Sequence, residues 1–102
     1  MRDYAREAIA MVAGRSRSHL DSDRMLALAL THLVEIVGEA ANRVSSEDQA
    51  RHPTIPWKQL TSMRNLLVHG YDQVDLDILW EVVRGDLPAL ADDLDRILSG
   101  EP

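Results

Sequence analysis

Apolar residues recur at intervals of three and four positions along nearly the whole chain. This spacing places side chains on one face of an α-helix, whereas no stretch alternates as a strand would. A first helix is predicted over about Asp3–Ala13, ending before Gly14 and a stretch rich in arginine and serine. The pattern therefore predicts an all-α protein.

A second helix is predicted over about Ser22–Val44, opened by the capping and acidic residues of Asp21–Asp23. Thirteen of its 23 positions are apolar, and they occupy more than one stripe. A helix that is apolar most of the way round has two surfaces to bury. In so short a chain, one surface can face the core, and we expect the other to face a second copy of the protein. The sequence thus predicts a dimer.

A short helix, capped at Ser45–Ser46 and followed by Glu47 and Asp48, is predicted to run to about Arg51, and the segment His52–Pro56 then breaks the chain. A third helix is predicted to start at Pro56, because the missing N–H of proline costs nothing in a first turn. Gly70 is predicted to end this helix. Its predicted core face carries Trp57, Leu60, Met63, Leu66 and Leu67.

A fourth helix is predicted to begin near Leu76, with apolar positions at helical spacing as far as Ile97. Pro88 removes one backbone hydrogen bond and clashes one turn back, so we expect a kink there rather than an end. Asp86 is expected to cap the second half. Four main helices and one short extra helix predict an up-and-down four-helix bundle.

The length of 102 residues predicts a single domain over residues 1–102. Cysteine is absent, which excludes a disulfide scaffold, a thiol nucleophile and any cysteine-ligated metal site. No run of 18 uncharged apolar residues occurs, and acidic residues near Met1 are unlike a signal peptide. We therefore expect a cytoplasmic protein that does not span a membrane.

The net charge of −6 argues against broad nucleic-acid binding through a basic surface. The charge is uneven, because residues 1–71 carry a net +1 and residues 72–102 a net −7. Ten of the 11 basic residues are arginines, which suit bidentate contacts with carboxylate or phosphate. The acidic element is thus the last helix, and the rest of the chain is close to neutral.

The candidate chemistry is concentrated in one segment, where Arg64 and Asn65 interrupt an apolar helix face and His69 and Tyr71 follow. On a straight helix Arg64 and His69 would lie about 140° apart. They could converge if the chain unwinds at Gly70, or if a second copy brings another set. Alternatively, Arg64 pairs with an acid of the last helix and His69 caps its own helix.

Other candidate ligands give weaker signals. His19 and His52 lie in polar or broken segments and are expected to be solvated, and His32 is expected to be a partly buried interface residue. Glu35 and Glu39 lie one helical turn apart, but no histidine shares their spacing. The sequence contains no metal-binding histidine pair and no phosphate-binding glycine loop, so we expect no metal site and no cofactor.

The chain resembles the HepT-like toxins of the HEPN (higher eukaryotes and prokaryotes nucleotide-binding) superfamily. The diagnostic element is an arginine, four residues, a histidine, one residue and a tyrosine, here Arg64, His69 and Tyr71. The resemblance covers nearly the whole chain and is carried by Ile55–Trp57, Met63–Tyr71, Asp75–Trp80, Val37–Ala41 and Asp86–Pro88.

The resemblance implies an all-α, HEPN-like dimer that places two copies of the motif in one cleft. It implies a metal-independent endoribonuclease that is the toxin of a type II toxin–antitoxin pair and acts on RNA. Arg64 and His69 would be catalytic, with Asn65 in a supporting role. The implied partner is a small nucleotidyltransferase antitoxin of the MntA type, which in some systems adenylylates the motif tyrosine, here Tyr71.

The chemistry of these residue types suits RNA cleavage by the adjacent 2′-hydroxyl. An imidazole titrates near pH 6.5 and can move protons, and a guanidinium can stabilise charge on phosphorus. Two motifs in a dimer would supply both an acid and a base, in a cleft that would be positive despite the net charge of −6. The acidic last helix would then have to lie away from that cleft or bind a basic partner. Two other hypotheses remain, a non-catalytic dimeric partner of a nucleotidyltransferase and a purely structural dimerisation domain.

Overall fold

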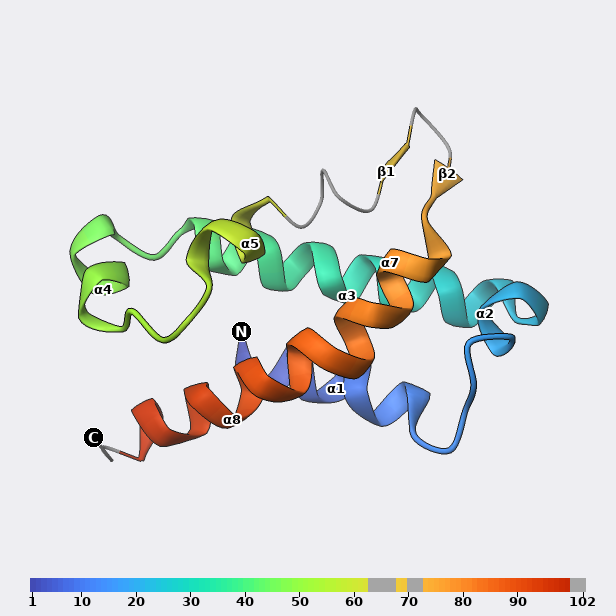
Figure 1. Ribbon diagram of the computed structural model, residues 1–102, viewed down its shortest axis with the longest axis horizontal. Coiled ribbons are helices and arrows are strands. Elements are labelled where there is room, and N and C mark those ends of the chain that lie inside the picture. The colour runs from blue at the N-terminus through green and yellow to red at the C-terminus, as the bar shows by residue number, and fades with distance from the viewer. Residues whose placement is uncertain (63–67, 70–72, 100–102) are drawn as a thin grey trace.

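The computed structural model describes residues 1–62, 68–69 and 73–99, with only the backbone described at 68, 69 and 73. The described chain is mostly helical (Figure 1). This agrees with the predicted all-α class. The elements in order are α1 (Arg2–Val12), α2 (His19–Ser22), α3 (Arg24–Asn42), α4 (Ser46–Arg51), α5 (Trp57–Thr61), β1 (Val68–His69), β2 (Gln73–Val74), α7 (Leu76–Glu81), the π-helical turn η1 (Val82–Asp86) and α8 (Leu87–Leu98).

The first two predicted helices are confirmed, with one correction at the start of the second. Helix α1 matches its prediction to within one residue at each end. Helix α3 begins at Arg24 rather than Ser22, because the Asp23 side chain caps it by accepting a hydrogen bond from the Leu26 N–H at 3.1 Å. Ser22 instead ends the separate helical turn α2, which buries Leu20. The polar stretch predicted to be irregular thus contains an anchored turn.

The third predicted helix is confirmed only at its beginning. The short α4 is capped by Ser45 as expected, and α5 follows Pro56. The helix was predicted to continue to Gly70, but Val68–His69 forms strand β1, which pairs with β2. The paired positions Val68 and Val74 are both β-branched, and such residues favour a pleated pair over a helical turn.

The fourth predicted helix starts at Leu76 and passes Pro88 without ending, as expected. Just before Pro88 the helix passes through the π-helical turn η1, in which the Leu87 N–H donates to the Val82 carbonyl five residues back. Pro88 is in the first turn of α8, where its missing N–H is tolerated. Asp86 does not cap α8, because its carboxylate accepts a hydrogen bond from Gln59 Nε2 at 3.1 Å.

One hydrophobic core holds these elements together. Helix α1 packs against both α3 and α8, and α3 also packs against α5 and α7. In Figure 1, α1 and α8 lie on one side of α3, and α5, β1 and β2 lie on the other. Fully buried side chains of the core include Leu20, Leu30, Val34, Val37, Leu60, Leu79, Val83, Leu87 and Leu90.

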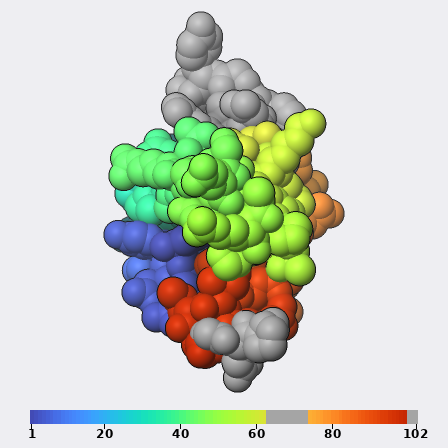
Figure 2. Space-filling model, turned by 90° about the vertical axis from the view of Figure 1, so that its left-hand side faces the viewer, coloured from blue at the N-terminus to red at the C-terminus, as the bar shows by residue number. Residues whose placement is uncertain are grey.

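The molecule is flat. Its Cα atoms span 41 × 30 × 15 Å, and the thin dimension is visible in Figure 2. Since a single helix with its side chains is about 10 Å across, a layer of this thickness cannot cover α3 on every side. Met25 and Leu28 on α3 accordingly remain 81% and 55% exposed. The predicted second apolar surface of this helix is therefore present and uncovered in the single chain.

Helix α3 is the one described helix that is long and apolar enough to cross a membrane by length and composition. It packs against α1, α2, α5 and α7 and supplies seven buried residues to the interior. That packing is typical of the central helix of a bundle. The predicted count of four main helices stays a prediction, since residues 63–67 lie outside the described residues.

Candidate functional site

The predicted motif lies in the segment between α5 and β2. Arg64, Asn65 and Tyr71 are outside the described residues, and for His69 only the backbone is described, in β1. Their catalytic, supporting and modified roles therefore stay predictions. The structure describes the elements around the motif: α5, which ends at Thr61, and the strands β1 and β2, which pair with each other. We call α5, β1 and β2 the motif frame.

Strand pairing locates the His69 backbone. In β1 and β2, Val68 pairs with Val74 and His69 pairs with Gln73 in antiparallel register. Paired Cα atoms lie about 4.5–5.5 Å apart and consecutive ones about 3.8 Å apart, so the His69 Cα lies within about 9 Å of the Val74 Cα. The angle of about 140° expected between Arg64 and His69 assumed one continuous helix, and β1 removes that assumption.

The end of this frame is held by Asp75. Its Oδ1 accepts hydrogen bonds from the backbone N–H groups of Asp77 at 3.0 Å and Ile78 at 3.1 Å. These contacts cap α7 directly after β2. Sequence reasoning placed Asp75 in the turn before the helix but did not identify it as the cap.

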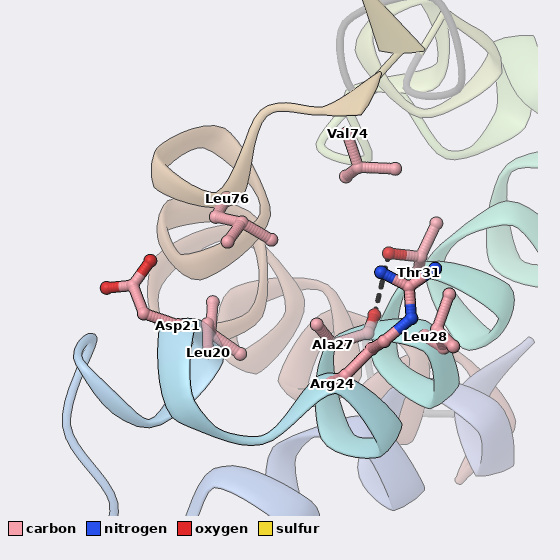
Figure 3. A pocket seen from close by; sticks show the side chains of 8 residues that line it. All are labelled: Leu20, Asp21, Arg24, Ala27, Leu28, Thr31, Val74 and Leu76. Atoms are coloured by element: carbon pink, nitrogen blue, oxygen red, sulfur yellow. Dashed lines mark hydrogen bonds between the residues drawn. The ribbon is translucent and has the colours of Figure 1, made fainter. Parts of the chain in front are cut away.

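Two cavities border α3. The first, of about 500 Å³, lies between α2, α3, β2 and the start of α7 (Figure 3). The second, of about 380 Å³, lies between α3 and the end of α5 at Thr61. One cavity thus adjoins the chain after the motif, and the other adjoins the chain before it.

Both cavities are lined by one stripe of residues along α3. The residues of this stripe are spaced in the i, i+3, i+4 pattern of a single helical face. They are Arg24, Ala27, Leu28, Thr31, Glu35, Gly38, Glu39 and Asn42. The second cavity brings Glu35 and Glu39 to one wall, but among the described residues no group of three His, Asp or Glu side chains could hold a metal ion.

Most described arginines are paired with acids. Arg2 and Arg6 of α1 bridge to Asp92 and Asp95 of α8, so part of the acidic last helix is offset by α1. In Figure 1, α1 and α8 lie on the side of α3 opposite to α5, β1 and β2. The α8 part of the acidic region therefore lies away from the two strands, whereas Asp75 and Asp77, at the start of α7, adjoin β2.

Arg17 joins α2 to α7. Its Nε donates to Asp77 at 2.8 Å and its Nη1 to Asp21 at 3.0 Å. The hydrogen bond to Asp77 is the main cause that raises the pKa of the Arg17 guanidinium above its ordinary value, and desolvation opposes it. Arg17 therefore stays charged throughout the physiological range and offsets the charge of Asp21.

Arg24 is different, because it forms no hydrogen bond or ion pair with any described residue, although it lines the first cavity. In Figure 3 its side chain runs along α3 toward Thr31. Neither Arg24 nor Thr31 was identified from the sequence. For Thr31 the available signal was a row of polar positions on an apolar helix, Thr31, Glu35, Glu39 and Asn42, at steps of four, four and three.

The described histidines differ in part from expectation. His19 Nδ1 accepts a hydrogen bond from the Ser16 N–H at 2.9 Å, so His19 belongs to the anchored turn α2 rather than to a solvated loop. His32 is exposed on α3 in the single chain, not partly buried. His52 is half-buried, and its carbonyl accepts a hydrogen bond from Trp57 Nε1 at 3.0 Å.

Comparison with known proteins gives one consistent result. A family model described as "Ribonuclease HepT-like" matches residues 1–97. "Putative RNase TTE0752" of Caldanaerobacter subterraneus is 33% identical over 93 residues, covering 91% of this chain and 83% of the relative. "Probable ribonuclease HepT" of Thermococcus cleftensis is 33% identical over 75 residues, covering 74% and 68%. "Putative RNase MJ1380" of Methanocaldococcus jannaschii is 30% identical over 76 residues, covering 74% and 70%. No solved structure matches at a significant level.

Proposed function

The chain belongs to the HepT-like ribonuclease family and is therefore an endoribonuclease. From this membership we propose that it cleaves RNA without a metal ion, using Arg64 and His69. The observation that carries the proposal is the family match over residues 1–97, which includes the whole Arg64–Tyr71 motif. Asn65 supports the two catalytic side chains.

The roles follow from the chemistry of the side chains. The 2′-hydroxyl attacks the neighbouring phosphorus, and the leaving 5′-oxygen takes up a proton. His69 transfers protons in this reaction, and such transfer contributes about 10²- to 10⁴-fold to the rate. The Arg64 guanidinium stabilises the charge that develops on the phosphate oxygens.

We propose that the active form is a homodimer, because one imidazole cannot act as acid and base in the same step. The support is the uncovered face of α3, where Met25 is largely exposed and Ile36 is half-buried. A patch of this kind on a flat molecule is typical of a protein interface. Docking two copies through α3 would bring their motif segments toward one groove.

Cleavage is expected to persist in the presence of EDTA. Purified protein is incubated with total RNA with and without the chelator, and products are separated on a denaturing gel. A matched sample of a magnesium-dependent ribonuclease serves as the control for chelation. Cleavage lost in EDTA and restored by a divalent cation would contradict the metal-independent mechanism. Absence of cleavage in both conditions would favour a non-catalytic partner of a nucleotidyltransferase.

The cellular role that fits this activity is the toxin of a type II toxin–antitoxin pair. Its antitoxin would be a small nucleotidyltransferase of the MntA type that transfers AMP to the Tyr71 hydroxyl. The modified tyrosine would carry a bulky group with a negative phosphate, two residues after His69. Such a group repels the phosphate of a substrate and occupies its space.

Adenylylation of Tyr71 is expected to reduce RNA cleavage to background. The protein is co-expressed with a nucleotidyltransferase of the MntA type, and intact-mass and peptide mass spectrometry measure added AMP. A Tyr71→Phe variant is the control, since it cannot accept AMP and should remain active beside the antitoxin. Full neutralisation of the unmodified protein, or of Tyr71→Phe, would contradict this mechanism of control.

A further inference from the structure

We propose that the cavity between α2, α3, β2 and α7 is a nucleotide subsite for single-stranded RNA, with the base against its apolar wall and a phosphate on Arg24. This inference rests on the proposed ribonuclease function and deepens it. It assigns a substrate-binding role to residues that lie outside the Arg64–Tyr71 motif.

The shape and lining of the cavity suit one nucleotide. Its volume of about 500 Å³ falls in the range of small-ligand sites, which are mostly apolar with a few placed polar groups. The apolar wall comes from four segments of the chain, and Figure 3 shows Val74 on β2 facing the α3 side. The wall is formed by Leu20, Ala27, Leu28, Val74 and Leu76. A base exposes its face to such a wall only when it is unstacked, so the cavity selects single-stranded RNA.

The charge of the cavity is complementary to phosphate. Asp21, the acid on its rim, is paired with Arg17 at 3.0 Å and points away from the cavity centre in Figure 3. Arg24 has no such partner among the described residues. An unpaired guanidinium beside a neutralised acid leaves a local positive charge, and its fork of N–H groups matches phosphate oxygens.

Thr31 supplies a polar group on the same wall. Its hydroxyl hydrogen is committed, because Oγ1 donates to the Ala27 carbonyl at 2.8 Å. The oxygen lone pairs therefore remain available as acceptors. A base amino group can donate to them.

The cavity adjoins the strand pair that carries the His69 backbone. Its wall residue Val74 pairs directly with Val68, the neighbour of His69. The His69 Cα lies within about 9 Å of the Val74 Cα by strand geometry. A nucleotide seated in the cavity therefore lies next to the strand that carries the proposed acid–base residue, as expected for a subsite near the cleaved bond.

Removal of the Arg24 guanidinium tests the subsite by RNA binding. Arg24→Ala is compared with Arg24→Lys and with the control Arg51→Ala, which removes an arginine that is 70% exposed and pairs only locally with Asp48. The probe is a fluorescent, uncleavable 2′-O-methyl octanucleotide pool of random sequence, titrated at several salt concentrations.

Arg24→Ala should bind the probe about tenfold more weakly, because it loses one charge-assisted phosphate contact. Its slope of log K against log salt should fall by about 0.7, the value for one phosphate of a single strand. Arg24→Lys should keep the slope, and Arg51→Ala should match the original protein.

Kinetics and controls separate this inference from its alternatives. Arg24→Ala should raise KM about tenfold with kcat unchanged, because the contact is made equally in ground and transition states. Equal effects of Arg24→Ala and Arg51→Ala would overturn the subsite while leaving ribonuclease activity intact. A free mononucleotide that competes as well as the octanucleotide would assign the cavity to small nucleotides instead. A change of oligomeric mass in Arg24→Ala would assign it to a protein interface. If the unsubstituted protein neither binds nor cleaves RNA, both the subsite and the proposed function are overturned.

Discussion

Replacing His69 with alanine is expected to lower the rate of RNA cleavage by about 10²- to 10⁴-fold. The imidazole is the one group of the motif that can exchange protons near neutral pH, and its loss leaves only binding and charge stabilisation. Arg64→Ala is expected to give a comparable loss, because charge on the phosphate would then be unopposed. The rate is measured on a defined RNA with purified, equally folded proteins.

The control for this experiment is His52→Ala. His52 belongs to the break before α5, and it serves the fold through its backbone carbonyl, which an alanine also supplies. Its variant should cleave at the original rate, and circular dichroism should show the same helix content in all three variants. Undiminished cleavage by both His69→Ala and Arg64→Ala would remove the proposed mechanism.

Replacing Met25 with aspartate is expected to dissociate the dimer and abolish cleavage. Met25 is 81% exposed in the single chain, so the change should leave the monomer's stability within about 0.5 kcal/mol. In a dimer formed through α3, the same carboxylate would be buried without a partner, at a cost of about 3 kcal/mol or more. That cost corresponds to a dimer Kd raised by about 100-fold or more. Light scattering measures the mass, and the RNA assay measures the rate.

Leu98→Asp is the matched control, since Leu98 is 63% exposed and lies at the end of α8 rather than on α3. It introduces the same charge at an exposed apolar position and should leave mass and rate unchanged. An original protein that is monomeric at all concentrations yet cleaves RNA would refute the shared-groove arrangement. A Met25→Asp variant that is monomeric but cleaves RNA at the full rate would also refute this arrangement.

Local signals along the chain predicted much of the helical framework. Ser45 caps α4 as expected, because a cap depends on the three residues that follow it. The helix of residues 76–98 passes Pro88, because the apolar spacing on both sides is buried against one core. The prediction of Asp86 as a cap was wrong, since its carboxylate is taken by Gln59, 27 positions away in sequence. A contact of that separation leaves no local pattern.

The strand pair shows the same limit. The segment before Gly70 has helical spacing, yet Val68 and His69 pair with residues 73–74. Strand pairing depends on a partner across a turn, so a single apolar run cannot predict it. The role of the motif residues themselves came from the resemblance of Arg64, His69 and Tyr71 to a known motif, and their side chains lie outside the described residues.

By itself the sequence determined the all-α class, the ends of the first helix to within one residue, the two apolar surfaces of the long second helix and the ribonuclease family, because periodicity, caps and motifs are local properties of the chain. Only the tertiary structure decided which stripe of α3 is buried, which is left open and which borders the two cavities. The first cavity exists because Leu20, Thr31 and Val74, from three separate segments, are brought to one place. That convergence is set by packing between distant segments, which is why Arg24, whose guanidinium has no partner among the described residues, could be recognised only in the folded chain.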